Sequence, residues 1–151
     1  MLTIQNLTKS FDNRQVVNSV SFSVGEEEIF ALVGPSGCGK TTILRLIAGL
    51  EQADSGRIDL MGNCLSGEKY AIPPEKRNIG FVFQDYALFP HLTVIENVAF
   101  GLKNLPETKR IKKAEDLLEM VQLLDMRHRR THDLSGGEQQ RVALVRSIAP
   151  N

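Results

Sequence analysis

The stretch of sequence that decides the fold reads Ile29-Phe30-Ala31-Leu32-Val33, Gly34-Pro35-Ser36-Gly37-Cys38-Gly39-Lys40-Thr41, Thr42-Ile43-Leu44-Arg45-Leu46-Ile47-Ala48-Gly49. Its apolar first part is typical of a strand that is buried on both faces, as in a parallel sheet. After Lys40 the apolar side chains fall at helical spacing, and Gly49 is a typical helix stop. The order strand, glycine loop, helix predicts an α/β fold.

The glycine loop fits the phosphate-binding pattern G-x-x-x-x-G-K-[ST] at every fixed position. Glycines allow successive N–H groups to face phosphate oxygens, and a helix N-terminus adds unpaired N–H groups. Lys40 is expected to contact the β- and γ-phosphates as a catalytic residue, and Thr41 to bind Mg²⁺ through its hydroxyl. A chance glycine-rich turn is the less favoured alternative. The predicted nucleotide-binding residues are Gly34, Pro35, Ser36, Gly37, Cys38, Gly39, Lys40, Thr41 and Thr42.

Cys38 has two interpretations. Lys40 and the helix N-terminus could activate its thiolate, or it is a small residue whose backbone N–H faces the phosphate. A lone cysteine favours the second interpretation. Cys38 and Cys64 form no C-x-x-C pair, which predicts free thiols in a reducing compartment.

Composition narrows the class of protein. The 151 residues include 18 Lys plus Arg and 18 Asp plus Glu, with 42% apolar residues. Balanced charge argues against a general nucleic-acid or anionic-membrane binder, and the apolar content argues against disorder. No apolar run approaches the roughly 20 residues of a membrane helix, and no signal peptide is visible at the N-terminus. One domain is the default expectation at this length.

A second motif narrows the identity. Leu134-Ser135-Gly136-Gly137-Glu138-Gln139-Gln140-Arg141 resembles the signature motif of the ATP-binding cassette (ABC) family. Phe83-Gln84-Asp85 stands where that family has its Q-loop, and Phe11 where an aromatic ring stacks on adenine. A capping box between Ser135 and Glu138 would explain a helix start there. It would not explain two glycines, each of which costs roughly 1 kcal/mol of helix propensity.

The resemblance implies roles for these residues. Ser135 and Gly137 would contact the γ-phosphate of ATP held by a second copy, with Gly136 beside them and Glu138 near the ribose. Gln84 would hold Mg²⁺ or the attacking water as a catalytic residue. The alternatives are an ordinary polar residue at a strand end for Gln84 and a core side chain for Phe11.

The resemblance also implies a fold and a set of parts. The fold is α/β: a P-loop NTPase core with an N-terminal antiparallel β subdomain and a helical insertion, ending before the Asp-Glu (Walker B) strand. Residues 1–151 would form a partial ATP-binding domain. Its expected parts are a β-rich subdomain at about 1–27 and 57–78, the P-loop strand and helix at 28–50, a helical subdomain at 85–134 and the signature helix at 135–149.

The family's Asp-Glu pair and switch histidine would follow the signature helix. His91, His128 and His132 all precede that position. We therefore expect an N-terminal portion of a longer ATPase that hydrolyses ATP only in its longer form. We also expect residues 29–33 to expose a strand edge and one apolar flank, because the neighbouring strand would be the Asp-Glu strand.

The amino-acid sequence of residues 74–80 and 84–94 is similar to that of bacterial import ATPases. The similarity is greatest to ferric-iron importers, followed by polyamine, sulfate and sugar importers. This implies a homodimeric, peripheral subunit on the cytoplasmic face of the inner membrane, with no nucleic-acid partner. A membrane permease would dock near Gln84–Val94, and an external solute-binding protein would act indirectly. One alternative is a non-hydrolysing nucleotide-binding module. A DNA-repair ABC ATPase is less favoured, because the stretch from Gln84 to Ser135 is too short for a long coiled coil.

Overall fold

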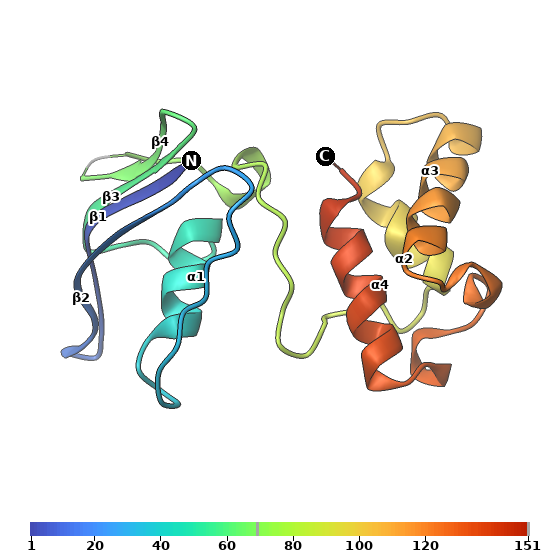
Figure 1. Ribbon diagram of the computed structural model, residues 1–151, viewed down its shortest axis with the longest axis horizontal. Coiled ribbons are helices and arrows are strands. Elements are labelled where there is room, and N and C mark those ends of the chain that lie inside the picture. The colour runs from blue at the N-terminus through green and yellow to red at the C-terminus, as the bar shows by residue number, and fades with distance from the viewer. Residues whose placement is uncertain (69, 151) are drawn as a thin grey trace. The chain divides into compact units, whose positions relative to one another are not determined.

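The structure is a computed structural model that describes residues 1–68 and 70–150. The chain forms two compact units, Met1–Ile79 and Gly80–Asn151, shown in Figure 1. Lys69, inside the predicted β-rich stretch 57–78, and Asn151 lie outside the described residues. No described helix combines the length and the apolar character needed to cross a membrane.

The first unit is built on an antiparallel sheet, as the sequence predicts. The strands occur in the order β2-β1-β3-β4-β5, and every pairing between neighbours is antiparallel. Asp12 and Asn13 connect the first two strands with positive φ angles of 47° and 62°, which suits a tight hairpin. The strands are β1 (Leu2–Phe11), β2 (Arg14–Val24), β3 (Ser55–Leu60), β4 (Asn63–Gly67) and β5 (Tyr70–Ala71).

Helix α1 (Lys40–Ala48) lies against this sheet (Figure 1). Its apolar face buries Ile43, Leu46 and Ile47 in one cluster with side chains of β1 and β3, including Ile4 and Ile58. The helix begins directly after the glycine loop and ends at Gly49, whose φ of 80° is the left-handed conformation of a helix C-cap. The predicted helix and its stop are therefore confirmed.

The predicted strand at residues 29–33 is not present. Ile29 and Val33 are 98% and 92% exposed, whereas Phe30 stacks on Phe22 at 4.8 Å and Leu32 packs against the core. A strand requires a hydrogen-bonding neighbour, and no described segment pairs with these residues. The prediction of a buried strand is thus wrong here, while the expectation of an exposed apolar flank is confirmed. Residues 79–83 also form no strand.

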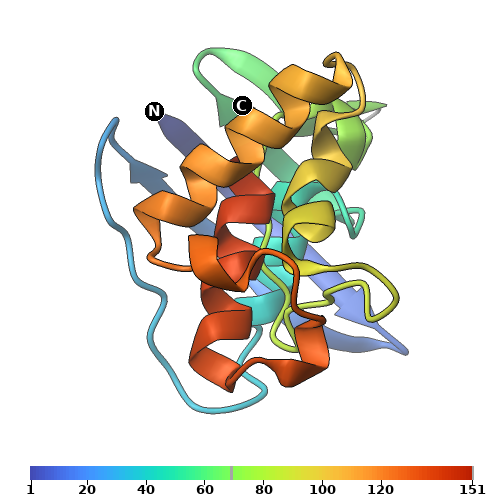
Figure 2. The same ribbon diagram turned by 90° about the vertical axis from the view of Figure 1, so that its right-hand side faces the viewer.

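The second unit is helical. It contains α2 (Val94–Ala99), α3 (Glu107–Met120) and α4 (Gly136–Ile148), which pack together in Figures 1 and 2. Thr93 and Glu96 form a capping box at the start of α2. Helix α3 ends at Met120, and Gln122 then turns the chain with a φ of 58°.

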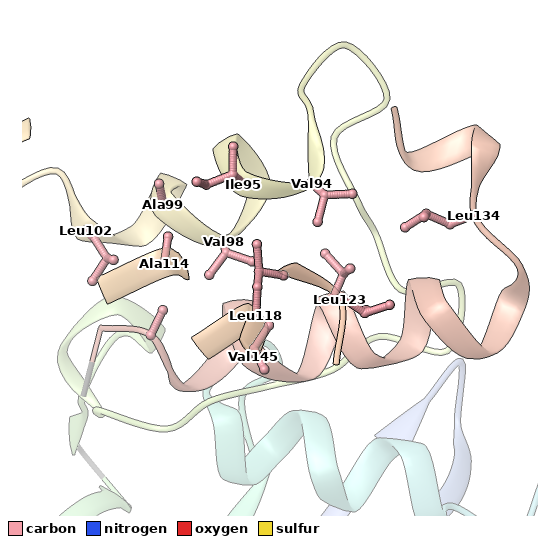
Figure 3. Packing of buried hydrophobic residues seen from close by; sticks show 12 residues of the cluster. Val94, Ile95, Val98, Ala99, Leu102, Ala114, Leu118, Leu123, Leu134 and Val145 are labelled. Atoms are coloured by element: carbon pink, nitrogen blue, oxygen red, sulfur yellow. The ribbon is translucent and has the colours of Figure 1, made fainter. Parts of the chain in front are cut away.

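One apolar core holds the three helices together. Leu118 of α3 is completely buried and points between α2 and α4 in Figure 3. The same cluster includes Val98 of α2, Val145 of α4 and Leu134, which precedes the cap of α4. The start of α4 is thereby fixed to the body of this unit.

Candidate nucleotide-binding site

The glycine loop forms a backbone turn that only glycine can adopt at one position. Gly39 has a φ of 96°, and a Cβ there would lie 2.7 Å from the carbonyl oxygen of Val16. Gly37 has a φ of 80°, and a Cβ there would meet nothing within 4 Å. The loop therefore packs closely against β2 on one side and is open at Gly37.

The N-terminus of α1 has the character of an anion-binding site. Its first hydrogen bond runs from the Ile43 N–H to the Gly39 carbonyl at 2.9 Å. The amides of residues 40–42 precede that bond and have no acceptor one helical turn earlier. The N-cap residue Gly39 provides no side chain, and the first turn contains no acidic residue. The positive end of the helix dipole is therefore left without a neighbouring negative charge.

Lys40 folds back over the loop. Its Nζ donates to the carbonyl oxygens of Gly34 at 2.8 Å and Pro35 at 2.7 Å, and lies 3.6 Å from the Cys38 Sγ. The two carbonyl acceptors are neutral, so these two hydrogen bonds do not compensate the ammonium charge. Cys38 is an exposed free thiol, and its Sγ would be 2.9 Å from a Cβ on Gly34.

The second predicted group of binding residues lies at the start of α4. The Ser135 hydroxyl and the Ser135 N–H both donate to the Glu138 carboxylate at 2.7 Å, and the Glu138 N–H donates back at 3.4 Å. The Ser135 hydroxyl, followed by its N–H, lowers the pKa of Glu138 below its usual value. A Cβ on Gly136 or Gly137 would meet nothing within 4 Å, so packing inside this unit does not require either glycine.

The remaining predicted residues lie at the edges of the two units. Phe11 ends β1 in the first unit, where its ring is 40% exposed and the Lys9 Nζ lies 4.9 Å from the ring centroid. Gln84 is exposed in the second unit, within a turn closed by a hydrogen bond of 3.0 Å from the Tyr86 N–H to the Phe83 carbonyl. The structure thus gathers residues 34–42 around one helix start and residues 135–138 around another.

The loop after Gln84 carries an aromatic surface. The ring of Phe89 lies 4.4 Å from that of Phe100 and 6.1 Å from that of His91. Lys103 lies over Phe100 at 4.0 Å and, together with Arg110, borders a cavity of about 190 Å³. Sequence reasoning placed a docking surface on residues 84–94 and missed these two cations, which lie outside that stretch.

Sequence reasoning also missed three polar side chains that hold the site's supporting structure. Arg77 is 4% exposed and donates to carbonyls at the end of α1. Asn97 is fully buried and bonds to the backbone of the aromatic loop. Arg146 bonds to carbonyls just after Gln84. For Asn97, an amide inside an apolar run was an available signal, whereas the sequence around Arg77 and Arg146 gives none.

Comparison with known proteins agrees with this geometry. The profile of the ABC transporter family matches residues 17–151. The putrescine transport ATP-binding protein PotG of Escherichia coli is 48% identical over 99% of this chain and 39% of its own length. The iron(III) import ATP-binding protein FbpC 2 of Haemophilus influenzae is 46% identical over the whole chain and 43% of its own length.

Solved structures show the same fold. The dimeric bacterial ABC transporter cassette MJ0796 superposes with a TM-score of 0.87 at 30% identity, covering all of this chain and 70% of the cassette. A second structure of that cassette, in a post-hydrolysis state with ADP and Pi, gives a TM-score of 0.86. The chain spans about two-fifths of the length of the curated relatives it matches. The α/β cassette fold predicted from the motifs is confirmed, and the chain belongs to the ABC transporter family.

Proposed function

We propose that this chain is the part of a bacterial ABC importer's ATPase subunit that binds ATP. The observation that carries the proposal is the open glycine loop at the uncapped N-terminus of α1, with the Lys40 ammonium bonded to two neutral carbonyls. Unpaired amides, a positive dipole end and a lysine ammonium together are the features that bind phosphate. The family match supports ATP as the source of that phosphate.

Each residue of the loop has a defined task in this proposal. Lys40 would exchange its two carbonyl acceptors for phosphate oxygens, because hydrogen bonds between ions are stronger than those to neutral groups. Residues 34–39 would surround the phosphates with backbone amides, and Thr42 would add its amide at the helix start. Phe11 would stack its exposed ring on the adenine.

Hydroxyl and amide oxygens are ligands of the kind that Mg²⁺ prefers. We propose Thr41 and Gln84 as its protein ligands. When bound, Mg²⁺ neutralises charge that develops between the β- and γ-phosphates.

The signature residues would complete the site of a second copy. Gly136 and Gly137 leave open space at the start of α4, so a phosphate could approach the backbone there. The Ser135 hydroxyl would exchange its bond to Glu138 for a phosphate oxygen, and Glu138 would face the ribose. The similar cassette of known structure is described as dimeric, which supports a homodimer.

The similar proteins support the proposal of a role in transport. Proteins for ferric-iron and for polyamine import match this chain at similar identity, between 45% and 49%, so both solutes remain candidates alongside sulfate and sugars. We propose a peripheral subunit on the cytoplasmic face of the inner membrane. A permease would dock near residues 84–94, where Phe89 and Phe100 form an aromatic surface, and an external solute-binding protein would act through that permease.

Calorimetric titration with MgATP tests the binding proposal. The wild-type chain is expected to bind, Lys40→Ala to bind at least about tenfold more weakly because one ionic hydrogen-bond donor is lost, and the surface control Lys109→Ala to bind as wild type. Absence of binding by the wild type, or equal affinity of Lys40→Ala, contradicts the proposal. Hydrolysis is then compared between this chain and a full-length form, with activity expected only in the latter.

A further inference from the structure

An arginine of the last helix bonds to the loop that follows Gln84. Arg146 of α4 donates from Nη1 to the Ala87 carbonyl at 2.7 Å and from Nη2 to the Tyr86 carbonyl at 2.9 Å. Its guanidinium carbon lies 5.3 Å from the centroid of the Phe89 ring. Both hydrogen bonds therefore go to loop carbonyls, and the planar group also covers an aromatic side chain of the same loop.

The two residues whose carbonyls accept these hydrogen bonds have an unusual backbone conformation. Tyr86 and Ala87 have φ angles of 62° and 46°, a left-handed conformation that is disfavoured for residues with a Cβ. Such a conformation persists where surrounding groups determine it. The two carbonyls that Arg146 holds belong to these same two residues, so its forked donor group is suited to maintain this turn.

A separate side chain holds the other end of the loop. The Asn97 Oδ1 accepts from the Phe89 N–H at 2.8 Å, and its Nδ2 donates to the carbonyls of Phe89 at 3.1 Å and Thr93 at 2.9 Å. Asn97 belongs to α2, so it anchors the end of the loop that is distant from Gln84. The end adjacent to Gln84 is anchored by Arg146, and thus by the helix that begins with the signature residues.

We propose that Arg146 is a positioning residue that fixes the Gln84 turn to α4, so that a displacement of the signature helix is passed directly to Gln84. The role of Gln84 and of the signature helix in ATP chemistry rests on the proposed function, whereas the mechanical link does not. An arginine is suited to this task because its two parallel donors fix an orientation, which a lysine ammonium cannot do.

Hydrogen exchange measured by mass spectrometry on this chain tests the link. In Arg146→Met, peptides covering residues 84–90 are expected to exchange at least about tenfold faster, since two hydrogen bonds from a charged donor are lost. Peptides from α2 and α3 are expected to remain as in wild type. The control Lys109→Met, which removes an exposed cation from α3, is expected to change neither region.

Arg146→Lys separates positioning from mere structural support. It keeps the charge and most of the side-chain stem, so we expect thermal stability near that of wild type but exchange at residues 84–90 close to that of Arg146→Met. Recovery of slow exchange in Arg146→Lys overturns the proposal, as does uniform acceleration across the whole helical unit in Arg146→Met.

A functional readout follows in the full-length protein with its permease. Arg146→Lys is expected to lower kcat for ATP hydrolysis by at least about tenfold with KM within about twofold of wild type, because a misplaced Gln84 affects the reaction rather than ATP binding. Unchanged kcat with a loosened loop overturns the proposal. A wild-type protein that fails to bind ATP contradicts the proposed function instead, and leaves the exchange result standing.

Discussion

Replacing Arg77 by methionine is expected to destabilise the helix that follows the glycine loop. The Arg77 Nη1 donates to the carbonyls of Leu46 and Ile47 at 2.8 Å, and its Nε donates to the Ile72 carbonyl at 2.7 Å. Leu46 and Ile47 lie in the last turn of α1, where carbonyls lack the usual helical partner four residues on. The Leu46 carbonyl also accepts the Gly49 N–H at 3.2 Å. Arg77 therefore caps the helix whose other end faces the proposed phosphates.

The expected loss in the free energy of unfolding follows from three hydrogen bonds and one buried charge. A hydrogen bond from a charged donor contributes about 1.5–3 kcal/mol, and an unsatisfied buried acceptor costs a similar amount. Removing the cation also removes the penalty of burying it, which is the cause of the lowered pKa of Arg77. We expect a net loss of about 2–4 kcal/mol, a large share of the 5–15 kcal/mol that stabilises a typical domain.

Urea unfolding followed by circular dichroism measures this loss, and hydrogen exchange locates it in α1. Arg57→Met is the matched control, because Arg57 is an exposed cation that pairs with Asp59 in the same unit, and we expect it to leave stability almost unchanged. A change below about 0.5 kcal/mol in Arg77→Met, within the range of ordinary surface substitutions, would refute the reasoning.

Three further predictions concern acid stability, thiol protection and self-association. The pKa of Glu138 is lowered by its bonds from Ser135, so the capping box contributes stability that is complete above the ordinary glutamate pKa of 4.5 and lost as the pH falls below it. Glu138→Gln should therefore flatten a titration of helix content below pH 4.5, and an unaltered titration would contradict this. Maleimide labelling of exposed Cys38 should block ATP binding and be slowed by MgATP. The half-buried Cys64 is the control and should label at the same rate with and without ATP. Equal labelling rates of Cys38 with and without ATP would count against the loop as the binding site. Because Ile29 is 98% exposed, Ile29→Lys should leave the free energy of unfolding within about 0.5 kcal/mol of wild type. The same substitution should reduce light scattering from self-association at high protein concentration. A clear loss of stability would show that the Ile29 side chain is packed.

Features set by neighbouring residues were predictable from the sequence. The capping boxes at Thr93 and Ser135 depend on side chains three positions away, and the Asp12-Asn13 hairpin depends on two turn residues. The glycine loop and the start of α1 depend on one continuous motif. In each case the physical cause lies within a few residues along the chain, so the pattern contains the information.

Features set by distant partners were not predictable. Residues 29–33 have the composition of a strand, but strand formation depends on a pairing neighbour elsewhere in the chain. Arg77 bonds to carbonyls 30 and 31 positions away, and Arg146 to carbonyls 59 and 60 positions away. No local pattern shows that these cations serve buried carbonyls rather than solvent.

Amide NMR spectra of the chain with and without MgATP test most directly whether the backbone of the glycine loop binds a triphosphate. We expect the largest shift changes at the amides of Gly37, Gly39, Lys40 and Thr41, because these N–H groups would gain phosphate acceptors. Lys40→Ala should greatly reduce those changes at the same ATP concentration. Saturating MgATP that leaves the loop amides unshifted, or shifts only surface lysine regions, would contradict the account.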